Sequence, residues 1–495
     1  MRIITINEII KLQHNWKLVT SLLLVFVLAT WKFGVVAMLL LVFVCLSFLS
    51  LFAAILKSNI IALGLIFTTA FTRVIFHLVG LPRAVPTLFT EFCVLLLLVK
   101  ALYLQLIVYN KPLRAVGFLP MVGVLAVATL SYIYNQSEIL PAIFFVRQIF
   151  TFYLFFIALL NLNLSEKTIL KINRFIIFLF LIQLPAALIK VITIGQDERW
   201  IGTVSWQAAQ LSTMLPLFAI SFLFAFYFFK RDKKYLLLVA GSFLFGIAGQ
   251  KKSLALLIPV VSGVVWYLYG KRAIPKKRLR LRVSQMKYLF IICVISYLGI
   301  FSASRILKSE MYGGHLDVKR LIDYIIWYNT RDQIALYGAD NPDHSMGRVT
   351  ITILSLNRLK ESGLIQQLIG FGPGAMILSP HLGRKEMAFE QFGLRGAIPG
   401  FVMFVLQVGF LGVMFWIYFF LKLFKKAYTT YQKSYNPNFK AVVLGFMGAT
   451  FTFILDFFIY GTSTMFLGIL TPVYFHVAAI VFRGDSQNFK ISSLS

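Results

Sequence analysis

The stretch FVMFVLQVGFLGVMFWIYFF, residues 401–420, carries no charged side chain. The hydrocarbon core of a bilayer is about 30 Å thick, and an α-helix needs about 20 mostly apolar residues to cross it. Similar runs recur along the chain, in which hydrophobic residues make up 59% of the sequence. Charged residues make up only 13%, compared with about 25% in soluble domains. The sequence therefore predicts an all-α, polytopic integral membrane protein.

Outward from this run, we predict about fourteen transmembrane helices and one large polar loop. The predicted spans are residues 15–31, 33–56, 58–80, 88–109, 114–134, 138–163, 169–194, 207–229, 235–249, 253–270, 286–307, 398–424, 440–461 and 463–483. The polar loop is expected to fold into short helices. Apolar residues from His315 to Tyr337 recur at helical spacing. A second helix is expected from Ser345, as its N-cap, to about Ile369.

These features divide the chain into five parts. They are an N-terminal transmembrane bundle (1–234), transmembrane helices that carry an outer lysine pair (235–307), the large outer loop (308–397), the C-terminal transmembrane helices (398–483) and a cytoplasmic tail (484–495).

Basic residues set the predicted orientation. With fourteen spans both termini lie on one side, and clusters that begin at Lys230, Lys271 and Lys422 fall on that side too. The positive-inside rule makes this side cytoplasmic and places the large loop on the outer face. The net charge of +30 is then explained by topology and by contact with anionic membrane lipids, and we expect no nucleic-acid partner.

Cysteine and histidine patterns predict neither a metal site nor a disulfide. Cys45, Cys93 and Cys293 each fall in an apolar span, where they resemble small buried hydrophobic residues. No cluster of cysteine and histidine has metal-site spacing, and we expect no metal or other cofactor.

The outer-loop segment GRVTITILSLNRLKESGLIQQLIGFGPGAMILSPH, from Gly347 to His381, is the best candidate for chemistry. Gly370, Gly372 and Gly374 either let backbone N–H groups approach a phosphate or simply end a helix. Arg348 is either an anion-binding cation or an arginine solvated by water and lipid headgroups. An unperturbed imidazole titrates near neutral pH, so His381 can accept a proton from a hydroxyl, although an ordinary loop histidine is the plainer interpretation.

Cations within or beside the spans are a second group of candidates. Lys251-Lys252 interrupts an apolar stretch and is predicted at the outer surface, against the positive-inside trend. A lipid-linked diphosphate is a natural partner for these lysines, and snorkelling to the interface is the alternative. Arg147 either joins a cationic pocket or forms a structural ion pair. Glu91 can neutralise a neighbour such as Arg73.

The order of these motifs resembles that of bacterial O-antigen ligases and O-antigen polymerases. Lys252-Ser253 opens a span, and the large outer loop follows with Gly347-Arg348, the GFGPG turn and His381. FGLRGAIPGF then leads back to the membrane, so the resemblance covers about residues 235–425. Two positions depart from it: Lys251-Lys252 stands where arginine is frequent, and Leu382 follows His381 where asparagine is common.

The resemblance implies a metal-independent glycosyltransferase at the outer face of the bacterial inner membrane. Its donor would be an oligosaccharide on undecaprenyl diphosphate. The diphosphate would be held by Arg348 and by Lys251 or Lys252, with Arg147 as a further candidate. His381 would orient or deprotonate the acceptor. The alternative bases are Glu386 and Glu390.

The acceptor decides among the activities that the resemblance allows. We favour a polymerase of lipid-linked repeat units for O-antigen, capsule or exopolysaccharide, with a chain-length regulator protein as a partner, because the chain has more spans and a longer loop than a compact ligase. The alternatives are an O-antigen ligase or protein O-oligosaccharyltransferase that uses the same donor. A flippase or transporter of lipid-linked oligosaccharides is a different class, which would be expected to show two related halves.

Overall fold

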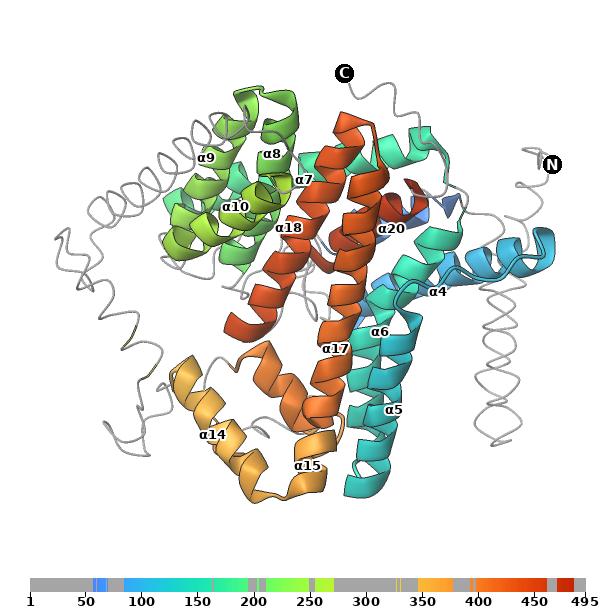
Figure 1. Cartoon of the computed structure of the whole chain (residues 1–495), viewed down its shortest axis with the longest axis vertical. Coiled ribbons are helices and arrows are strands. Elements are labelled where there is room, and N and C mark those ends of the chain that lie inside the picture. Colours follow the sequence, from blue (N-terminus) through green and yellow to red (C-terminus); the bar gives the residue numbers. More distant parts are fainter. Residues whose placement is uncertain are drawn as a thin grey trace.

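Every element of the structure, a computed structural model, is a helix among the residues it describes (Figure 1). These residues are 57, 58, 60–67, 69, 84–162, 164–194, 203, 211–248, 254–270, 326, 330, 346–376, 392–394, 398–460 and 470–484. The elements are α4 (Ala84–Leu102), the π-helix η1 (Tyr103–Val108), α5 (Phe118–Asn135), α6 (Ile139–Asn161), α7 (Glu166–Ile194), α8 (Leu211–Lys230), α9 (Lys234–Ala248), α10 (Leu254–Gly270), α14 (Arg348–Glu361), α15 (Leu364–Ile369), α17 (Gly400–Lys433), α18 (Pro437–Ile459) and α20 (Leu470–Gly484).

The described helices confirm a multi-pass helical membrane protein. Seven are long and apolar enough to cross a membrane, at Leu88–Val108, Phe118–Asn135, Ile139–Asn161, Thr168–Ile189, Thr213–Lys230, Gly400–Lys433 and Pro437–Ile459. Two shorter apolar helices are Leu257–Gly270 and Leu470–Arg483. The predicted spans at 15–31, 33–56 and 286–307, and most of that at 58–80, lie outside the described residues. The total of fourteen spans therefore stays a prediction.

The single helix predicted from Ser345 to Ile369 is wrong, because two helices occupy this stretch. Helix α14 begins at Arg348 with Gly347, and not Ser345, as its N-cap. It ends at Glu361, and α15 follows after Gly363, whose φ of 97° lies outside the range of a helix. Of the other predicted loop helix, His315–Tyr337, only residues 326 and 330 are described, and both are helical.

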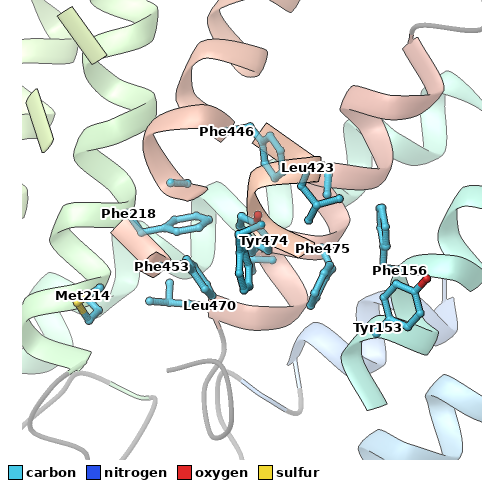
Figure 2. Packing of buried hydrophobic residues seen from close by; sticks show 14 of the residues in the cluster. Tyr153, Phe156, Met214, Phe218, Leu423, Phe446, Phe453, Leu470, Tyr474 and Phe475 are labelled. Carbon is cyan, nitrogen blue, oxygen red and sulfur yellow. The ribbon is translucent and has the colours of Figure 1, made fainter. Parts of the chain in front are cut away.

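The centre of the bundle is a cluster of aromatic rings from α8, α18 and α20 (Figure 2). Tyr474 of α20 is fully buried and stacks on Phe453 and Phe446 of α18, with ring centroids 4.5 and 5.0 Å apart. Phe453 also meets Phe218 of α8 at 6.0 Å. The Tyr474 hydroxyl is satisfied by a 3.0 Å hydrogen bond with Thr450. Each ring pair contributes about 0.5–1.5 kcal/mol beyond its buried area.

One end of this bundle is rich in lysine and arginine, and we call it the basic end. Phe228 of α8 stacks with Tyr269 of α10 at 5.1 Å, so both helices end at the same level. Phe229 of α8 meets Tyr431 of α17 at 6.3 Å, which brings the end of α17 to that level too. The cations there include Lys230, Arg231, Lys233, Lys234, Lys425, Lys426 and Lys433. Among them, hydrogen bonds from Lys234 lower the pKa of Asp232.

The opposite end, which we call the loop end, is formed by the start of α8, the end of α18 and the turn between α5 and α6. Tyr460, which follows α18, and Thr213 in the first turn of α8 share a 3.5 Å hydroxyl hydrogen bond. Helix α5 runs antiparallel to α17, because Gly117 at its start lies against Phe419 and its last turns lie beside the start of α17. Helices α14 and α15 also lie at this end (Figure 1).

Two glycines of α18 allow its close contact with α8 and α10. A β-carbon at Gly445 would lie 2.9 Å from the Cα of Phe222 in α8. One at Gly448 would lie 2.6 Å from the Val265 side chain of α10 and 3.0 Å from Ser221 of α8. Small residues let membrane helices approach in this way, and packing at such contacts is what holds them together.

Replacing Gly445 with alanine should weaken the contact between α8 and α18. The added methyl group meets the backbone of Phe222, and overpacking of this kind costs about 1–3 kcal/mol. Gly263→Ala in α10 is the matched control, since nothing lies within 4 Å of its added β-carbon. We expect the melting temperature of the detergent-solubilised protein to fall for Gly445→Ala only. An equal melting temperature in the two variants would contradict the packing described.

Candidate functional site

Helix α17 is broken at the loop end. Val408 (φ −130°, ψ 15°) and Gly409 (φ 63°, ψ −173°) leave the helical region. Phe404, before the break, stacks on Trp416, after it, with ring centroids 5.3 Å apart, whereas a continuous helix would separate these positions by about 18 Å. The segment 400–407 therefore folds back against the rest of the helix (Figure 1).

The span predicted at 398–424 corresponds to α17 from Gly400 onward, but the helix is interrupted at Val408 and Gly409. Residues 410–433 continue as a helix about 36 Å long at 1.5 Å per residue, and its second half carries Lys422, Lys425, Lys426 and Lys433. The segment 400–407 is about 12 Å long, too short to cross a bilayer core of about 30 Å. Gly409 combines a positive φ with a ψ near 180°, a conformation that is essentially restricted to glycine.

The break is filled by the end of α15 and by residues 370–376, which we call the glycine loop. A β-carbon at Gly409 would clash with the backbone of Leu368 and Ile369, so the last residues of α15 are in direct contact with Gly409. A β-carbon at Gly370 would likewise lie 2.6 Å from the backbone of α17 at the break. Two chain segments thus meet backbone to backbone, with no space for a side chain between them.

Hydrogen bonds join the glycine loop to the broken helix. A helix break leaves carbonyls without the N–H groups that the next turn would supply. Here the N–H of Phe371 donates to the carbonyl of Leu406 at 2.7 Å, and that of Gly372 to the carbonyl of Gln407 at 3.2 Å. The N–H of Gly374 donates to the side-chain Oε1 of Gln407 at 2.9 Å.

The other side of the glycine loop rests on the turn between α5 and α6. The amide Nδ2 of Asn135 donates to the carbonyl of Gly370 at 3.0 Å. A β-carbon at Gly372 would overlap the hydroxyl of Ser137. One at Gly374 would overlap the backbone at the start of α6. The φ angles of the three glycines are 78°, 115° and 90°, so both conformation and contact require glycine.

These contacts account for the three glycines by packing, which favours the structural interpretation of the GFGPG turn. Three backbone N–H groups of the turn already donate to α17. Contact between these groups and a phosphate would require the loop to leave the break. The expected part of Gly370, Gly372 and Gly374 in binding a substrate stays a prediction.

Arg348 lies where several elements meet at the loop end. It is the first residue of α14, and its guanidinium carbon is 5.1 Å from the ring centroid of Tyr460, within the range of a cation–π interaction. The carbonyl of Tyr460 accepts the N–H of Gly400, the first residue of α17, at 2.9 Å. The Arg348 side chain is partly exposed. A cation thus lies beside the start of α17 and the end of α18.

Arg147 of α6 forms an ion pair with Glu91 of α4, through its Nε and the Oε1 of the carboxylate. Phe145, two residues earlier, faces Phe404 of α17 with ring centroids 5.7 Å apart. Residues two apart on a helix point in nearly opposite directions, so Arg147 faces away from the glycine loop. Of its two expected roles, the structure shows the structural pair, while contact with a diphosphate stays a prediction. Arg73, the partner expected for Glu91, lies outside the described residues.

The other predicted site residues, Lys251, Lys252, His381, Glu386 and Glu390, lie outside the described residues. The helix that follows the lysine pair is described from Leu254. A β-carbon on Gly448 of α18 would contact both Val265 of α10 and Ser221 of α8. Closer to the basic end, Tyr269 of α10 stacks with Phe228 of α8, so the two helices run in the same direction. Helix α10 therefore begins toward the loop end, the end that also holds Arg348 and the glycine loop.

Sequence reasoning missed Gln407 and Asn135, which hold the glycine loop. Gln407 lies in an apolar run that was predicted as one membrane span. The order Gln407-Val408-Gly409, a polar residue followed closely by a glycine, is nevertheless a signal for an interrupted membrane helix. Asn135 begins a polar turn between two apolar spans, which predicts the turn but not its partner. Tyr460 carries no sequence signal that distinguishes it from other tyrosines.

Within the described part of the chain, no group of three or more His, Cys, Asp or Glu side chains is placed to hold a metal ion. The carboxylate of Glu91 is engaged with Arg147, on the side of α6 away from the glycine loop. Arg348, beside Tyr460, is our candidate for stabilising an anionic substrate at the described loop end, where α14 also carries the exposed cations Arg358 and Lys360.

Gly409→Ala should disrupt the loop end severely, because the added methyl group meets backbone atoms of Leu368 and Ile369 that cannot turn away. Gly393→Ala is a control for backbone strain alone, since Gly393 also has a positive φ, 68°, but has nothing within 4 Å of an added β-carbon. Size-exclusion chromatography and thermal unfolding should show loss of folded protein for Gly409→Ala and a small decrease in stability for Gly393→Ala. Similar stability of both would contradict the described contact with α15.

The sequence matches none of the protein-family models against which it was compared, and none of the curated proteins.

Proposed function

We propose that this membrane protein is a glycosyltransferase that polymerises oligosaccharide repeat units carried on undecaprenyl diphosphate. The proposal combines the motif order between Lys252 and Gly400 with the position of Arg348 at the loop end. The products would be O-antigen, capsule or exopolysaccharide chains. The reaction would take place at the outer face of the bacterial inner membrane.

The observation that carries the proposal is the separation of Arg348 from the basic end. Lysines and arginines gather where α8, α10 and α17 end, and the positive-inside rule assigns such an end to the cytoplasm. Arg348 lies at the other end, over Tyr460. A cation held there is suited to an anionic lipid headgroup presented at the outer face. The start of α10, which follows Lys251-Lys252 in the sequence, lies toward the same end.

The proposed reaction needs charge stabilisation and one base. A hydroxyl of the acceptor attacks the anomeric carbon of the donor sugar, and the bond between that carbon and the diphosphate oxygen breaks. The proton of the hydroxyl passes to His381, or to Glu386 or Glu390, and the polyprenyl diphosphate leaves with the bonding electrons. Arg348 and the lysine pair would stabilise the negative charge that develops on the leaving group. Arg147 is already paired with Glu91, so the proposed site does not depend on it.

The broken helix α17 is an observation that favours a second candidate, a transporter of lipid-linked oligosaccharides. Transporters place unwound backbone beside the substrate, which binds to the exposed groups. In this protein the carbonyls of Leu406 and Gln407 at the break accept hydrogen bonds from the glycine loop. The break is therefore filled by the protein itself, and glycosyl transfer is the function that we prefer. A ligase with the same donor differs only in its acceptor.

Arg348→Ala should lower polymerisation by about a hundredfold or more, the usual effect of removing one group that stabilises a developing charge. Arg348→Lys should keep part of the activity, because it retains the charge but loses the bidentate fork. Arg358→Ala is the matched control, since Arg358 is a 63% exposed arginine on the same helix. The measurement is chain growth by purified protein from lipid-linked repeat units, with melting temperatures to verify folding.

His381→Ala should abolish chain growth in the same assay. Full activity in both Arg348→Ala and His381→Ala would refute the site assignment. If the wild-type protein makes no glycan product while a known polymerase does so under the same conditions, the enzyme function itself is refuted. Movement of the donor across the bilayer without transfer would then favour the transporter.

The proposed orientation makes a separate prediction about labelling. Gln136, in the exposed turn after α5, should face outward, and Tyr435, which is 93% exposed at the basic end, should face the cytoplasm. In a chain whose native cysteines are replaced, a membrane-impermeant maleimide should label Gln136→Cys in intact bacterial spheroplasts. It should label Tyr435→Cys only after the membrane is opened. The reverse pattern would place the loop end, and Arg348 with it, in the cytoplasm.

A further inference from the structure

Gln407 has all the polar atoms of its side chain engaged at the break in α17. Its Oε1 accepts the N–H of Gly374 at 2.9 Å, and its Nε2 donates to the carbonyl of Met403 at 2.8 Å. Its main-chain carbonyl accepts from both Gly372 and the hydroxyl of Ser131, at 3.2 and 3.3 Å. The residue is 4% exposed. One glutamine therefore ties the glycine loop, α5 and the segment 400–407 together.

The contacts made by Gln407 continue along the chain to Arg348. The glycine loop follows α15 directly, and the end of α15 lies on Gly409. Helix α15 follows α14 after the turn at Gly363, and both helices pack against α17. Arg348 begins α14, so its position depends on how the glycine loop and α15 are seated in the break.

A second series of contacts connects Arg348 to Gln407 through Tyr460 and Gly400, so the two residues are connected from both sides. The guanidinium of Arg348 lies over the ring of Tyr460, and the carbonyl of Tyr460 accepts the N–H of Gly400. Residues 400–407 then lead to Gln407. In Figure 1, α14, α15 and the first segment of α17 form a triangle at the loop end. Contacts on both sides determine the position of Arg348 better than a single connection does.

We propose that Gln407 is a positioning residue, which holds the glycine loop in the break and thereby sets the position of α14 and Arg348. The main-chain bonds from Phe371 and Gly372 hold the first half of the loop, and the Gln407 side chain holds its second half at Gly374. Gly374 is buried, so an apolar side chain at position 407 would leave its N–H without an acceptor. The catalytic consequence of this placement rests on the proposed function, whereas the placement itself does not.

Two variants remove the connection in independent ways. Gln407→Met keeps the side-chain length and approximate volume but removes the acceptor for the Gly374 N–H. Gly374→Ala adds a methyl group that overlaps the start of α6, so the loop cannot occupy its present position. Gln407→Met still tests the proposal if Gly374→Ala yields no folded protein, because it introduces no clash.

Gln105→Met is the matched control for a loss of stability without a loss of position. Gln105 of η1 donates its Nε2 to the carbonyl of Asn161 at 2.7 Å, which is also a hydrogen bond from a glutamine side chain to the backbone. Asn161 ends α6, whose first residues lie at the loop end, so this bond lies far from Arg348 and toward the other end of the bundle. We expect this variant to lower the melting temperature without moving α14.

The position of α14 can be measured with two spin labels in the full chain. Lys360→Cys labels the exposed face of α14, and Tyr134→Cys labels the last turn of α5, in a background whose three native cysteines are replaced by alanine. Pulsed electron paramagnetic resonance should give one narrow distance distribution with Gln407 present. We expect Gln407→Met and Gly374→Ala to shift or broaden it, and Gln105→Met to leave it unchanged. An unchanged distribution in Gln407→Met overturns the proposal.

Transfer of lipid-linked repeat units tests whether this position matters for the reaction. A misplacement of about 1 Å can cost about a hundredfold in rate, so Gln407→Met should lower turnover by about that factor with little change in KM for the donor. Gln105→Met should keep the wild-type turnover. Full turnover in Gln407→Met, with a shifted label distance, overturns the positioning of Arg348 as a requirement of the reaction. If the wild-type protein is inactive, the proposed function fails, and the label distances alone decide whether Gln407 positions α14.

Discussion

The carbonyls of Leu406 and Gln407 lie at a buried break in α17, and a buried carbonyl without a hydrogen bond costs about 1–3 kcal/mol. Their partners are the N–H groups of Phe371 and Gly372, supplied from a separate part of the chain. To reach them the glycine loop must approach the helix backbone to backbone, which excludes a β-carbon at Gly370. The glycine pattern of the loop and the polar residue in the helix are therefore two consequences of the same constraint.

This constraint determines where the candidate chemistry lies. When the glycine loop occupies the break, the end of α15 lies against α17. Helix α14, which precedes α15, then has its first residue near the end of α18. Arg348, at the start of α14, then lies over Tyr460, at the end of the bundle opposite to the lysine-rich turns. A membrane enzyme that acts on a lipid-linked diphosphate needs cations at one face that are distinct from its topology signals. The loop end provides such a cation on a support that is tied to α5, α6, α17 and α18.

Much of the fold was predictable because hydropathy is a property of a local stretch of sequence. The predicted spans at 138–163 and 253–270 differ by only a few residues from α6 and α10. The predictions failed where an interruption involved a single residue and its partner lay far away in the sequence. Gly409 breaks an otherwise apolar helix, and Gly363 divides what had been predicted as one helix into α14 and α15. Arg147 was correctly recognised as an ion-pair candidate, but its partner Glu91 could not be chosen over others.

Local hydropathy and residue type are enough to identify this chain as a helical membrane protein and to select the residues that are candidates for binding an anion. Both conclusions depend on composition and spacing within one stretch, since the cost of placing a side chain in a bilayer is largely independent of its distant neighbours. In contrast, it takes the folded chain to reveal that the GFGPG turn fills a broken helix and that Gln407 accepts a hydrogen bond from the Gly374 N–H. Such contacts are not encoded in one stretch, because a hydrogen bond or a close backbone contact joins two particular groups. Many pairings are compatible with the same sequence pattern, and packing selects one of them.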